Sequence, residues 1–139
     1  AIDRSLKLDP EGEVIELEVG SIIVATGFQV MEKDWFKEFA PKSPNVITAL
    51  QLERLISSTG PMGGKLLRPS DKEKPKTVTF VSCVGSRDEK FHTYCSRVCC
   101  MYMIKQARLL KEKYPDLEIN MHFIDVRTPG KGYDEYYTG

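Results

Sequence analysis

The feature that most constrains the fold is a strand, helix and strand pattern in the second half of the chain. Residues 77–82, Thr-Val-Thr-Phe-Val-Ser, are β-branched and aromatic, which predicts a strand. A helix is predicted over residues 96–114, where Pro115 stops it, and residues 117–126 are predicted to form the next strand. These elements in this order make a βαβ unit. We therefore expect an α/β fold with a Rossmann-like βαβ unit and a parallel sheet.

The cysteines of the chain form a single cluster. There are four, all between residues 83 and 100: Cys83, Cys95, Cys99 and Cys100. A secreted disulfide scaffold usually spreads its cysteines out, so the clustering favours a metal or redox site in a reducing compartment. If the helix begins near Cys95, then Cys95 and Cys99 share one face of it, and Cys83 faces them from the end of the first strand. The sequence therefore predicts a cage of four thiols.

A helix N-terminus suits a polythiolate site, because free amide groups and the helix dipole stabilise thiolates and lower their pKa. Arg87 and Arg97 are expected to add positive charge. The spacing C-x11-C-x3-C-C matches neither zinc ribbons nor bacterial ferredoxins, which makes zinc a less favoured metal. Two alternatives stay open. The cysteines are buried as small hydrophobic residues, or they form a redox-active pair, which would strain a ring between Cys99 and Cys100.

The turn after the first strand lacks a nucleotide-binding fingerprint. In a dinucleotide-binding unit this turn carries G-x-G-x-x-G. Here it reads Cys-Val-Gly-Ser-Arg-Asp over residues 83–88, with Gly85 as its one glycine. Cysteines stand where the nucleotide-binding glycines belong, so we expect a cluster in place of NAD(P).

The first half of the chain predicts a small β-rich part followed by a helix. Residues 13–19 alternate apolar and acidic side chains, as a half-exposed strand does, and residues 21–25 are continuously apolar, as a buried strand is. Thr26 and Gly27 close this second strand, at the end where ligands bind in open α/β sheets. Thr48 and Gln51 predict a capping box for a helix that ends before Gly60.

Three regions follow from these assignments. Residues 1–59 form the first lobe with its connecting helix, residues 60–76 a glycine- and proline-rich linker loop, and residues 77–139 the incomplete Rossmann-like lobe with the cysteine site. The chain starts at Ala1 without a methionine and stops at Gly139 soon after a predicted strand. We therefore expect it to be an internal fragment of a longer protein.

Charge and hydropathy exclude two classes of partner. Lysine and arginine together number 20, as do aspartate and glutamate, so no net charge attracts nucleic acid. No apolar run reaches the roughly 18 residues of a membrane span, and no signal peptide is visible. The expectation is a cytoplasmic protein that binds no nucleic acid and has no membrane span.

The sequence resembles the A subunit of heterodisulfide reductase, the flavin and iron–sulfur component of this enzyme in methanogens, which has relatives in other anaerobes. The matching stretches are residues 23–28, 46–48, 51–55, 68–71, 83–88, 94–102 and 130–133. The block around residues 94–102, Tyr-Cys-Ser-Arg-Val-Cys-Cys-Met-Tyr, is the most specific of them. The family's ferredoxin-type cluster motifs and its N-terminal FAD fingerprint are absent from this chain.

The resemblance implies a thioredoxin-reductase-like flavoprotein as the parent, an oxidoreductase of methanogenesis with FAD and several 4Fe-4S clusters. It implies that the four cysteines ligate one 4Fe-4S cluster, which relays electrons to or from the flavin. The first lobe would then be the end of an FAD-binding domain, with Thr26 and Gly27 supplying a minor part of the flavin site. The implied partners are other heterodisulfide reductase subunits and an electron-donating hydrogenase or dehydrogenase.

Whether the segment alone is an enzyme is left open by the sequence, and the expectation is a fragment that is inactive by itself. An alternative function belongs to a different class. The chain is then a non-catalytic structural or subunit-interaction lobe, in which the cysteines hold zinc or remain free.

Overall fold

The computed structural model describes residues 18–139 of the chain. The chain divides into two units, residues 1–30 and residues 31–139. The second unit holds every helix and strand assigned among the described residues. No helix within residues 18–139 is both long and apolar enough to cross a membrane.

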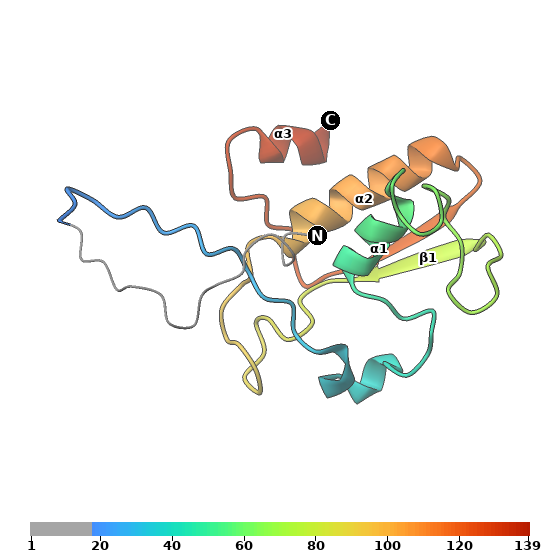
Figure 1. The fold of residues 1–139 in the computed structure, drawn as a ribbon, viewed down its shortest axis with the longest axis horizontal. Helices are drawn as coiled ribbons and strands as arrows, with labels where there is room; N and C mark the ends of the chain where they lie inside the picture. The colour runs from blue at the N-terminus through green and yellow to red at the C-terminus, as the bar shows by residue number, and fades with distance from the viewer. Residues whose placement is uncertain (1–17) are drawn as a thin grey trace, which may run out of the picture. The chain divides into compact units, whose positions relative to one another are not determined.

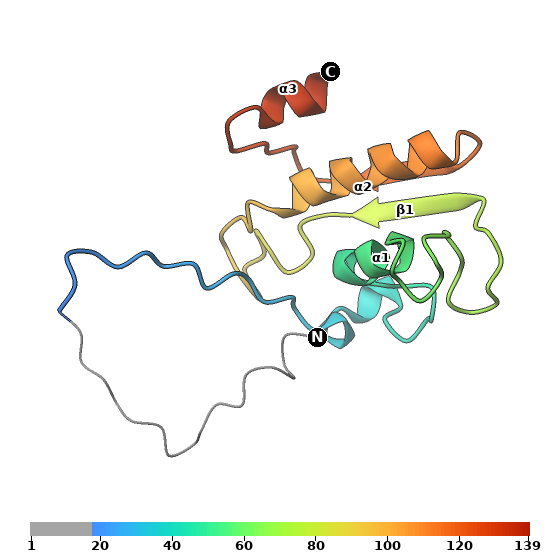
Figure 2. The same ribbon diagram turned by 45° about the horizontal axis from the view of Figure 1, so that its top comes forward.

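The predicted βαβ unit is confirmed. Strand β1 (Thr77–Val81) pairs in parallel with strand β2 (Glu118–His122), and helix α2 (Cys99–Lys113) connects them. The register runs from Thr77 opposite Glu118 to Val81 opposite His122. Figures 1 and 2 show α2 running alongside β1 with helix α1 (Ala49–Ile56) next to them. The α/β fold class is therefore the one that the sequence predicts.

Helix α2 starts later than predicted, at Cys99 instead of residue 96. Arg97 has a φ of 63°, in the left-handed region, and Val98 precedes the helix without a side-chain cap. A left-handed residue cannot be part of a right-handed helix, so the turn at Arg97 fixes the start of α2. The second strand is also shorter than predicted, because its ladder with β1 ends at His122.

The core of the second unit joins helices α1 and α2 to the strands. Its buried members come from α1, β1, α2 and two connecting segments: Leu52, Leu66, Phe80, Met103, Ala107, Leu110 and Leu117. Helix α1 has the predicted capping box, in which Thr48 Oγ1 accepts from the Gln51 amide at 3.2 Å and Gln51 Oε1 accepts from the Thr48 amide at 2.8 Å.

The segment 60–76 contains no helix or strand, and it packs into this same core. Leu66 is buried, and its amide donates to the Tyr114 hydroxyl at 3.0 Å. Lys113 Nζ donates to the Gly64 carbonyl at 2.6 Å. The boundaries predicted at residues 59 and 76 therefore do not separate structural units in the described chain.

Between residue 18 and α1 the structure has two short 3-10 helices, η2 (Lys33–Trp35) and η3 (Lys37–Phe39). Phe36, between them, is buried and lies against the Phe91 ring with the ring centroids 4.7 Å apart. A last short helix, α3 (Tyr133–Thr138), is held to α2 by Arg108, whose guanidinium donates to the Tyr136 carbonyl at 2.6 Å.

The strand predicted at residues 21–25 is wrong for this structure. These residues are extended, but they form no strand, and Ile23 is 91% exposed. A strand needs a neighbour to pair its amides and carbonyls, and the described residues supply none to this segment. The strand predicted at residues 13–19 lies outside the described residues, apart from its last two.

Candidate metal centre

Cys83 lies just after strand β1, with Ser82 between them because the strand ends one residue earlier than predicted, and its backbone conformation is unusual. Its φ is 60°, which is rare for a residue other than glycine, and its carbonyl accepts from the Ser86 amide at 3.1 Å. Its sulfur lies 3.7 Å from Ser82 Oγ. Such conformations persist only where the surroundings hold them, and they concentrate at functional sites.

Residues 83–98, here called the cysteine loop, fold back so that the first part of the loop is hydrogen-bonded to the last part. Asp88 and His92 face each other, with the Asp88 amide donating to the His92 carbonyl at 3.0 Å. The Arg87 amide donates to the Tyr94 carbonyl at 3.0 Å. Phe91 lies against Phe36, which anchors the tip of the loop to the segment before α1. The position of the cysteines is therefore set by hydrogen bonds inside the loop and by aromatic packing outside it.

Cys95 lies in this loop and not on helix α2. Its sulfur accepts from the Arg97 amide at 3.4 Å, a local turn that precedes the helix. It lines a shallow hollow together with Arg97, Arg127, Thr128 and Pro129. The predicted shared helical face of Cys95 and Cys99 is wrong, because the helix begins only at Cys99.

Cys99 and Cys100 are the first two residues of α2, and both are buried. The Cys100 sulfur accepts from the Arg127 amide at 3.4 Å, and its thiol donates to the Asp125 carbonyl at 3.9 Å. The segment that follows β2 therefore holds Cys100 through main-chain groups alone.

Three of the thiols share one environment, at the end of β1 and the start of α2. Burial raises the pKa of the Cys100 thiol, and the neighbouring Cys99 and Cys83 thiols raise it further. The Arg127 amide acts in the opposite direction without reversing the shift. The expectation that the helix N-terminus lowers the pKa is therefore wrong for Cys100. Burial, with the same three thiols as further causes, raises the pKa of Tyr102 to about 12.

The structure does not assemble all four sulfurs into a cage. Cys83, Cys99 and Cys100 lie near one another, whereas Cys95 is held in its own turn. Within residues 18–139, no three histidine, cysteine, aspartate or glutamate side chains are placed to hold one metal ion. None of the four cysteines forms a disulfide. As a donor set, four free thiols fit an iron–sulfur cluster, and both Cys95 and the other three thiols would have to shift to converge on one.

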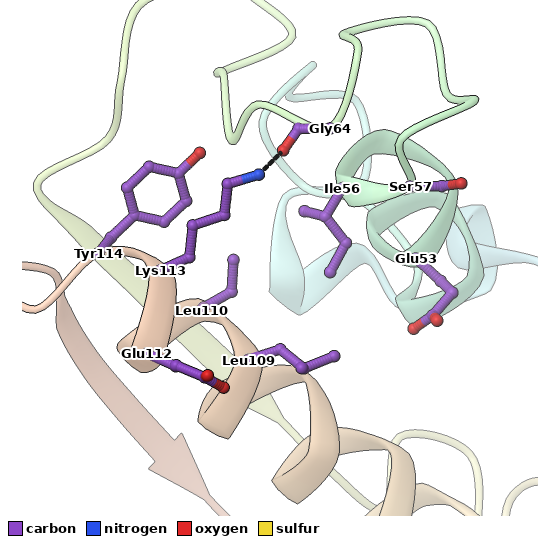
Figure 3. A pocket seen from close by; sticks show the side chains of 9 residues that line it. All are labelled: Glu53, Ile56, Ser57, Gly64, Leu109, Leu110, Glu112, Lys113 and Tyr114. Carbon is purple, nitrogen blue, oxygen red and sulfur yellow. Dashed lines mark hydrogen bonds between the residues drawn. The ribbon is translucent and has the colours of Figure 1, made fainter.

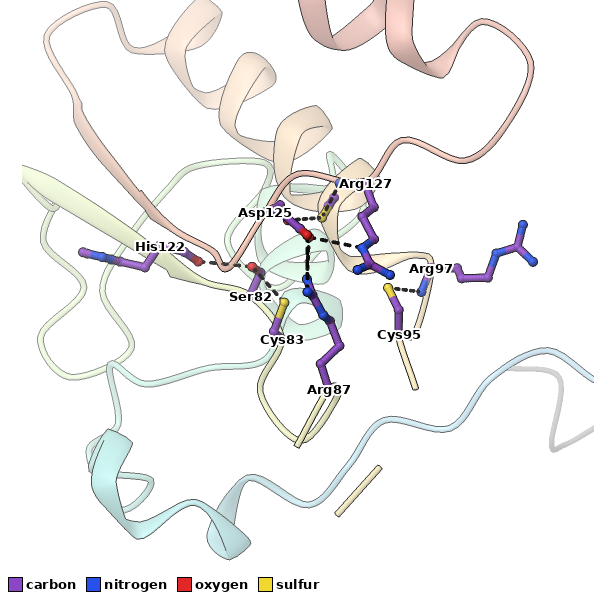
Figure 4. Close-up of polar contacts among 9 residues, drawn as sticks. Ser82, Cys83, Arg87, Cys95, Arg97, His122, Asp125 and Arg127 are labelled. Carbon is purple, nitrogen blue, oxygen red and sulfur yellow. Dashed lines mark hydrogen bonds and ion pairs between the residues drawn. The ribbon is translucent and has the colours of Figure 1, made fainter. Parts of the chain in front are cut away.

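An ion-pair network that sequence reasoning missed borders the thiols. Arg87 binds both carboxylate oxygens of Asp125, with its second contact at 3.3 Å, and Arg127 Nε donates to Asp125 Oδ1 at 3.2 Å (Figure 4). The hydrogen bond from Arg87, then that from Arg127, lowers the pKa of Asp125. Asp125 lies just after the second strand, as Cys83 lies just after the first. This position at the carboxyl end of a parallel strand is the sequence feature that could have indicated a role for Asp125 at the site.

The two arginines expected to add charge differ in their positions. The Arg87 guanidinium lies beside the Cys83 thiol and Asp125, which together raise the pKa of Arg87, with Asp125 as the main cause. Arg97 is exposed, and Figure 4 shows its side chain pointing away from Cys83 and Asp125. The structure places one of the two expected charges at the thiols.

Thr26 and Gly27 lie in the first unit, and both are exposed. Gly27 has a φ of 73°, and a Cβ at this position would meet no atom within 4 Å. At the position of the predicted turn the structure has a left-handed glycine in open space, with no strand before it and no turn at Thr26 or Gly27.

A second hollow lies between the two larger helices, away from the cysteines (Figure 3). Ile56 and Leu109 line its apolar part, and Glu53, Glu112 and Lys113 surround it with charges. Lys113 reaches across it to the Gly64 carbonyl. It contains no residue that the sequence singles out for chemistry.

No protein-family model matches the chain. A heterodisulfide reductase protein of Archaeoglobus profundus, named as A-subunit-like, is 63% identical to it, over 99% of this chain and 22% of that protein. The A subunit of the H(2):CoB-CoM heterodisulfide,ferredoxin reductase of Methanothermobacter marburgensis is 52% identical, over 96% of this chain and 20% of that protein. The A subunit of the ferredoxin/F(420)H(2)-dependent CoB-CoM heterodisulfide reductase of Methanosarcina acetivorans is 51% identical, over 97% and 17%. The chain spans about a fifth of the length of these curated relatives.

Proposed function

The chain is homologous over almost its whole length to a segment of the A subunit of heterodisulfide reductase, and on this premise we propose that it is an electron-transfer segment of such a protein. The observation that carries the proposal is the position of the cysteines. Cys83 lies two residues after strand β1 of the βαβ unit, and Cys99 and Cys100 begin its helix, with all four thiols free. This is the edge of an α/β sheet at which ligands bind.

In the proposed site, Cys83, Cys95, Cys99 and Cys100 hold a 4Fe-4S cluster. Helix α2 fixes Cys99 and Cys100, and the left-handed backbone at Cys83 turns this residue toward them. Cys95 joins them by a rearrangement of the turn in which the Arg97 amide now binds its sulfur. When bound, such a cluster accepts and releases single electrons at a potential that nearby charges and solvent set.

The flavin and the partners belong to the same proposal. Thr26 and the left-handed Gly27 would contact FAD in a lobe completed by other parts of the parent protein, in which residues 21–25 find their partner strands. Names of the relatives mention H2, ferredoxin and F420H2 beside the heterodisulfide. We propose that electrons pass between the cluster, the flavin and partner subunits, with a hydrogenase or dehydrogenase as the donor.

A second candidate function is a non-catalytic structural or interaction lobe with zinc-bound or free cysteines. No three metal ligands are preformed within residues 18–139, which favours the form of this lobe with free cysteines over the form with zinc. The raised pKa of the Cys100 thiol favours the same form, because a neutral buried thiol packs as a small apolar group.

Iron and acid-labile sulfide analysis of anaerobically purified protein separates the two candidates. The electron-transfer proposal predicts about four irons and four sulfides per chain with broad absorption near about 400 nm. Replacing any one of the four cysteines by serine should lower the iron content, whereas Ser96→Ala, inside the same loop, should retain it. Protein that holds zinc or no metal after anaerobic reconstitution would support the structural lobe.

A further inference from the structure

We propose that Asp125 is a positioning residue for the cysteine site, and that its ion pair with Arg87 holds the cysteine loop against the start of helix α2. The inference rests on the proposed function, because it concerns how the thiols are presented to a cluster. The contacts that carry it are nevertheless present in the chain by itself, and they are tested there first.

Arg87 links the ion pair to two of the cysteines. Its guanidinium lies beside the Cys83 thiol, and its own amide binds the carbonyl of Tyr94, the residue before Cys95. Its φ is 57°, so the backbone turns sharply at this point to present the side chain. The side chain is 20% exposed, which makes it the less solvated partner of the pair.

Asp125 links the ion pair to the start of α2. Its carboxylate receives Arg87 and Arg127, while its main-chain carbonyl accepts from the Cys100 thiol. The Arg127 amide donates to the same sulfur at 3.4 Å. A change to the Asp125 side chain therefore removes the ion pairs and leaves the main-chain contacts of Cys100 available.

The Arg87–Asp125 pair is the sole hydrogen-bonded link between the cysteine loop and residues 123–129 in the part of the chain that the structure describes. Loss of this pair should let the loop move away from residues 123–129, the segment that contacts Cys100, because no other hydrogen bond among the described residues joins the two segments. The buried thiols at the start of α2 would then meet solvent more often.

Alkylation by iodoacetamide in the metal-free full chain, read at each cysteine by mass spectrometry, tests this inference. Asp125→Asn and Arg87→Gln should each raise the rate at Cys100 and Cys83 about two- to fivefold, the range expected for losing a partly exposed ion pair. Because both changes break one link, the double variant should react no faster than either single variant. Asp71→Asn is the matched control, since Asp71 also pairs with an arginine, Arg68, in the 60–76 segment.

Iron content after reconstitution separates this inference from the proposed function. Asp125→Asn should retain less iron than the wild type during gel filtration, while Asp71→Asn retains as much. If Asp125→Asn and Arg87→Gln are alkylated faster but neither the wild type nor any variant binds iron, the proposed cluster is wrong and the positioning role of Asp125 is supported. Unchanged alkylation and iron in both Asp125→Asn and Arg87→Gln, in protein whose circular dichroism shows it folded, would overturn the positioning role alone.

Discussion

Gly85 is the residue on which the course of the cysteine loop depends most directly. Its φ is 72°, and a Cβ there would lie 2.3 Å from Met31 Sδ and 2.7 Å from the Phe36 ring. The single glycine left where a nucleotide fingerprint would stand thus has a packing role here. It lets the loop pass over the aromatic anchor formed by Phe36 and Phe91.

Gly85→Ala should therefore destabilise the protein. The left-handed backbone alone costs about 1 kcal/mol for a residue with a Cβ, and displacing Phe36 adds a similar amount, so the loss should be about 2–3 kcal/mol. Urea unfolding measures it. Gly63→Ala is the control, because Gly63 also has a positive φ but open space around its Cβ, and it should lose only about 1 kcal/mol. Equal losses would mean that crowding at Gly85 has no effect.

The geometry of the cysteines shows where residue-level prediction ends. Local sequence patterns place Cys83 close to the end of a strand and Cys99 and Cys100 near a helix start, but not at the first two helical residues. The position of Cys95 does not follow from such patterns, because it depends on the left-handed turn at Arg97, and arginine gives no local signal for that conformation. The Arg87–Asp125 pair joins residues far apart in sequence, so a single sequence does not reveal it.

At the scale of elements, helices α1 and α2 are joined by polar groups as well as by the core. Lys105 Nζ donates to Glu53 Oε1 at 2.6 Å, and Gln106 Nε2 donates to Glu53 Oε2 and to the Ala49 carbonyl, both at 3.0 Å. The hydrogen bonds from Lys105, then from Gln106, lower the pKa of Glu53 below its ordinary value of 4.5.

The interactions of Glu53 with Lys105 and Gln106 make a small part of the folding stability depend on pH. Because the pKa of Glu53 is lowered by folding, its contribution is present above about pH 4.5 and is lost as the pH falls through the lowered value. Glu53 is 43% exposed, so the contribution should be a few tenths of a kcal/mol.

Comparison of Glu53→Gln with the wild type in urea at neutral and acid pH measures this contribution. The stability difference should be present at neutral pH and shrink in acid. Glu112→Gln is the control, because Glu112 has no ion pair in the described part of the chain. A difference for Glu53→Gln that grows in acid would contradict the sign of the pKa shift.

The elements that were predicted correctly are those defined by local signals. The capping box of α1, the β-branched strand β1 and Pro115 after α2 each act within a few residues. The burial of Leu66 and the pairing of residues 21–25 depend on distant parts of the chain. The sequence pattern therefore predicted a strand at residues 21–25 that does not form here, and it gave no indication that the 60–76 segment packs into the core.

At the scale of the whole molecule, the second unit has its own complete core. The residues of that core, and the hydrophobic side chains packed against it, all lie between Ile47 and Met121. A second group of side chains, Met31 and Phe36, packs against the cysteine loop at Gly85. Among residues 18–30, none belongs to either group, and Ile22, Ile23 and Val24 are largely exposed.

A chain shortened to residues 31–139 should therefore fold with unchanged stability and aggregate less. Exposed β-branched runs promote pairing between chains, so removing them should lower the apparent size of the protein in light scattering. The unfolding free energy should stay within about 0.5 kcal/mol of the full chain, because residues 18–30 supply no side chain to the core.

Phe36→Ala in the shortened chain supplies the contrast. It removes a buried ring that packs on Phe91 and contacts the Gly85 turn, so it should cost about 3 kcal/mol and loosen the cysteine loop. Cys83 and Cys100 should then react faster with iodoacetamide, as in Asp125→Asn. If the shortened chain itself unfolds, residues before Met31 contribute to the core, and the division of the molecule at Val30 is wrong. If it folds and Phe36→Ala leaves both thiols protected, the loop is held by Arg87 and Asp125 without the aromatic anchor.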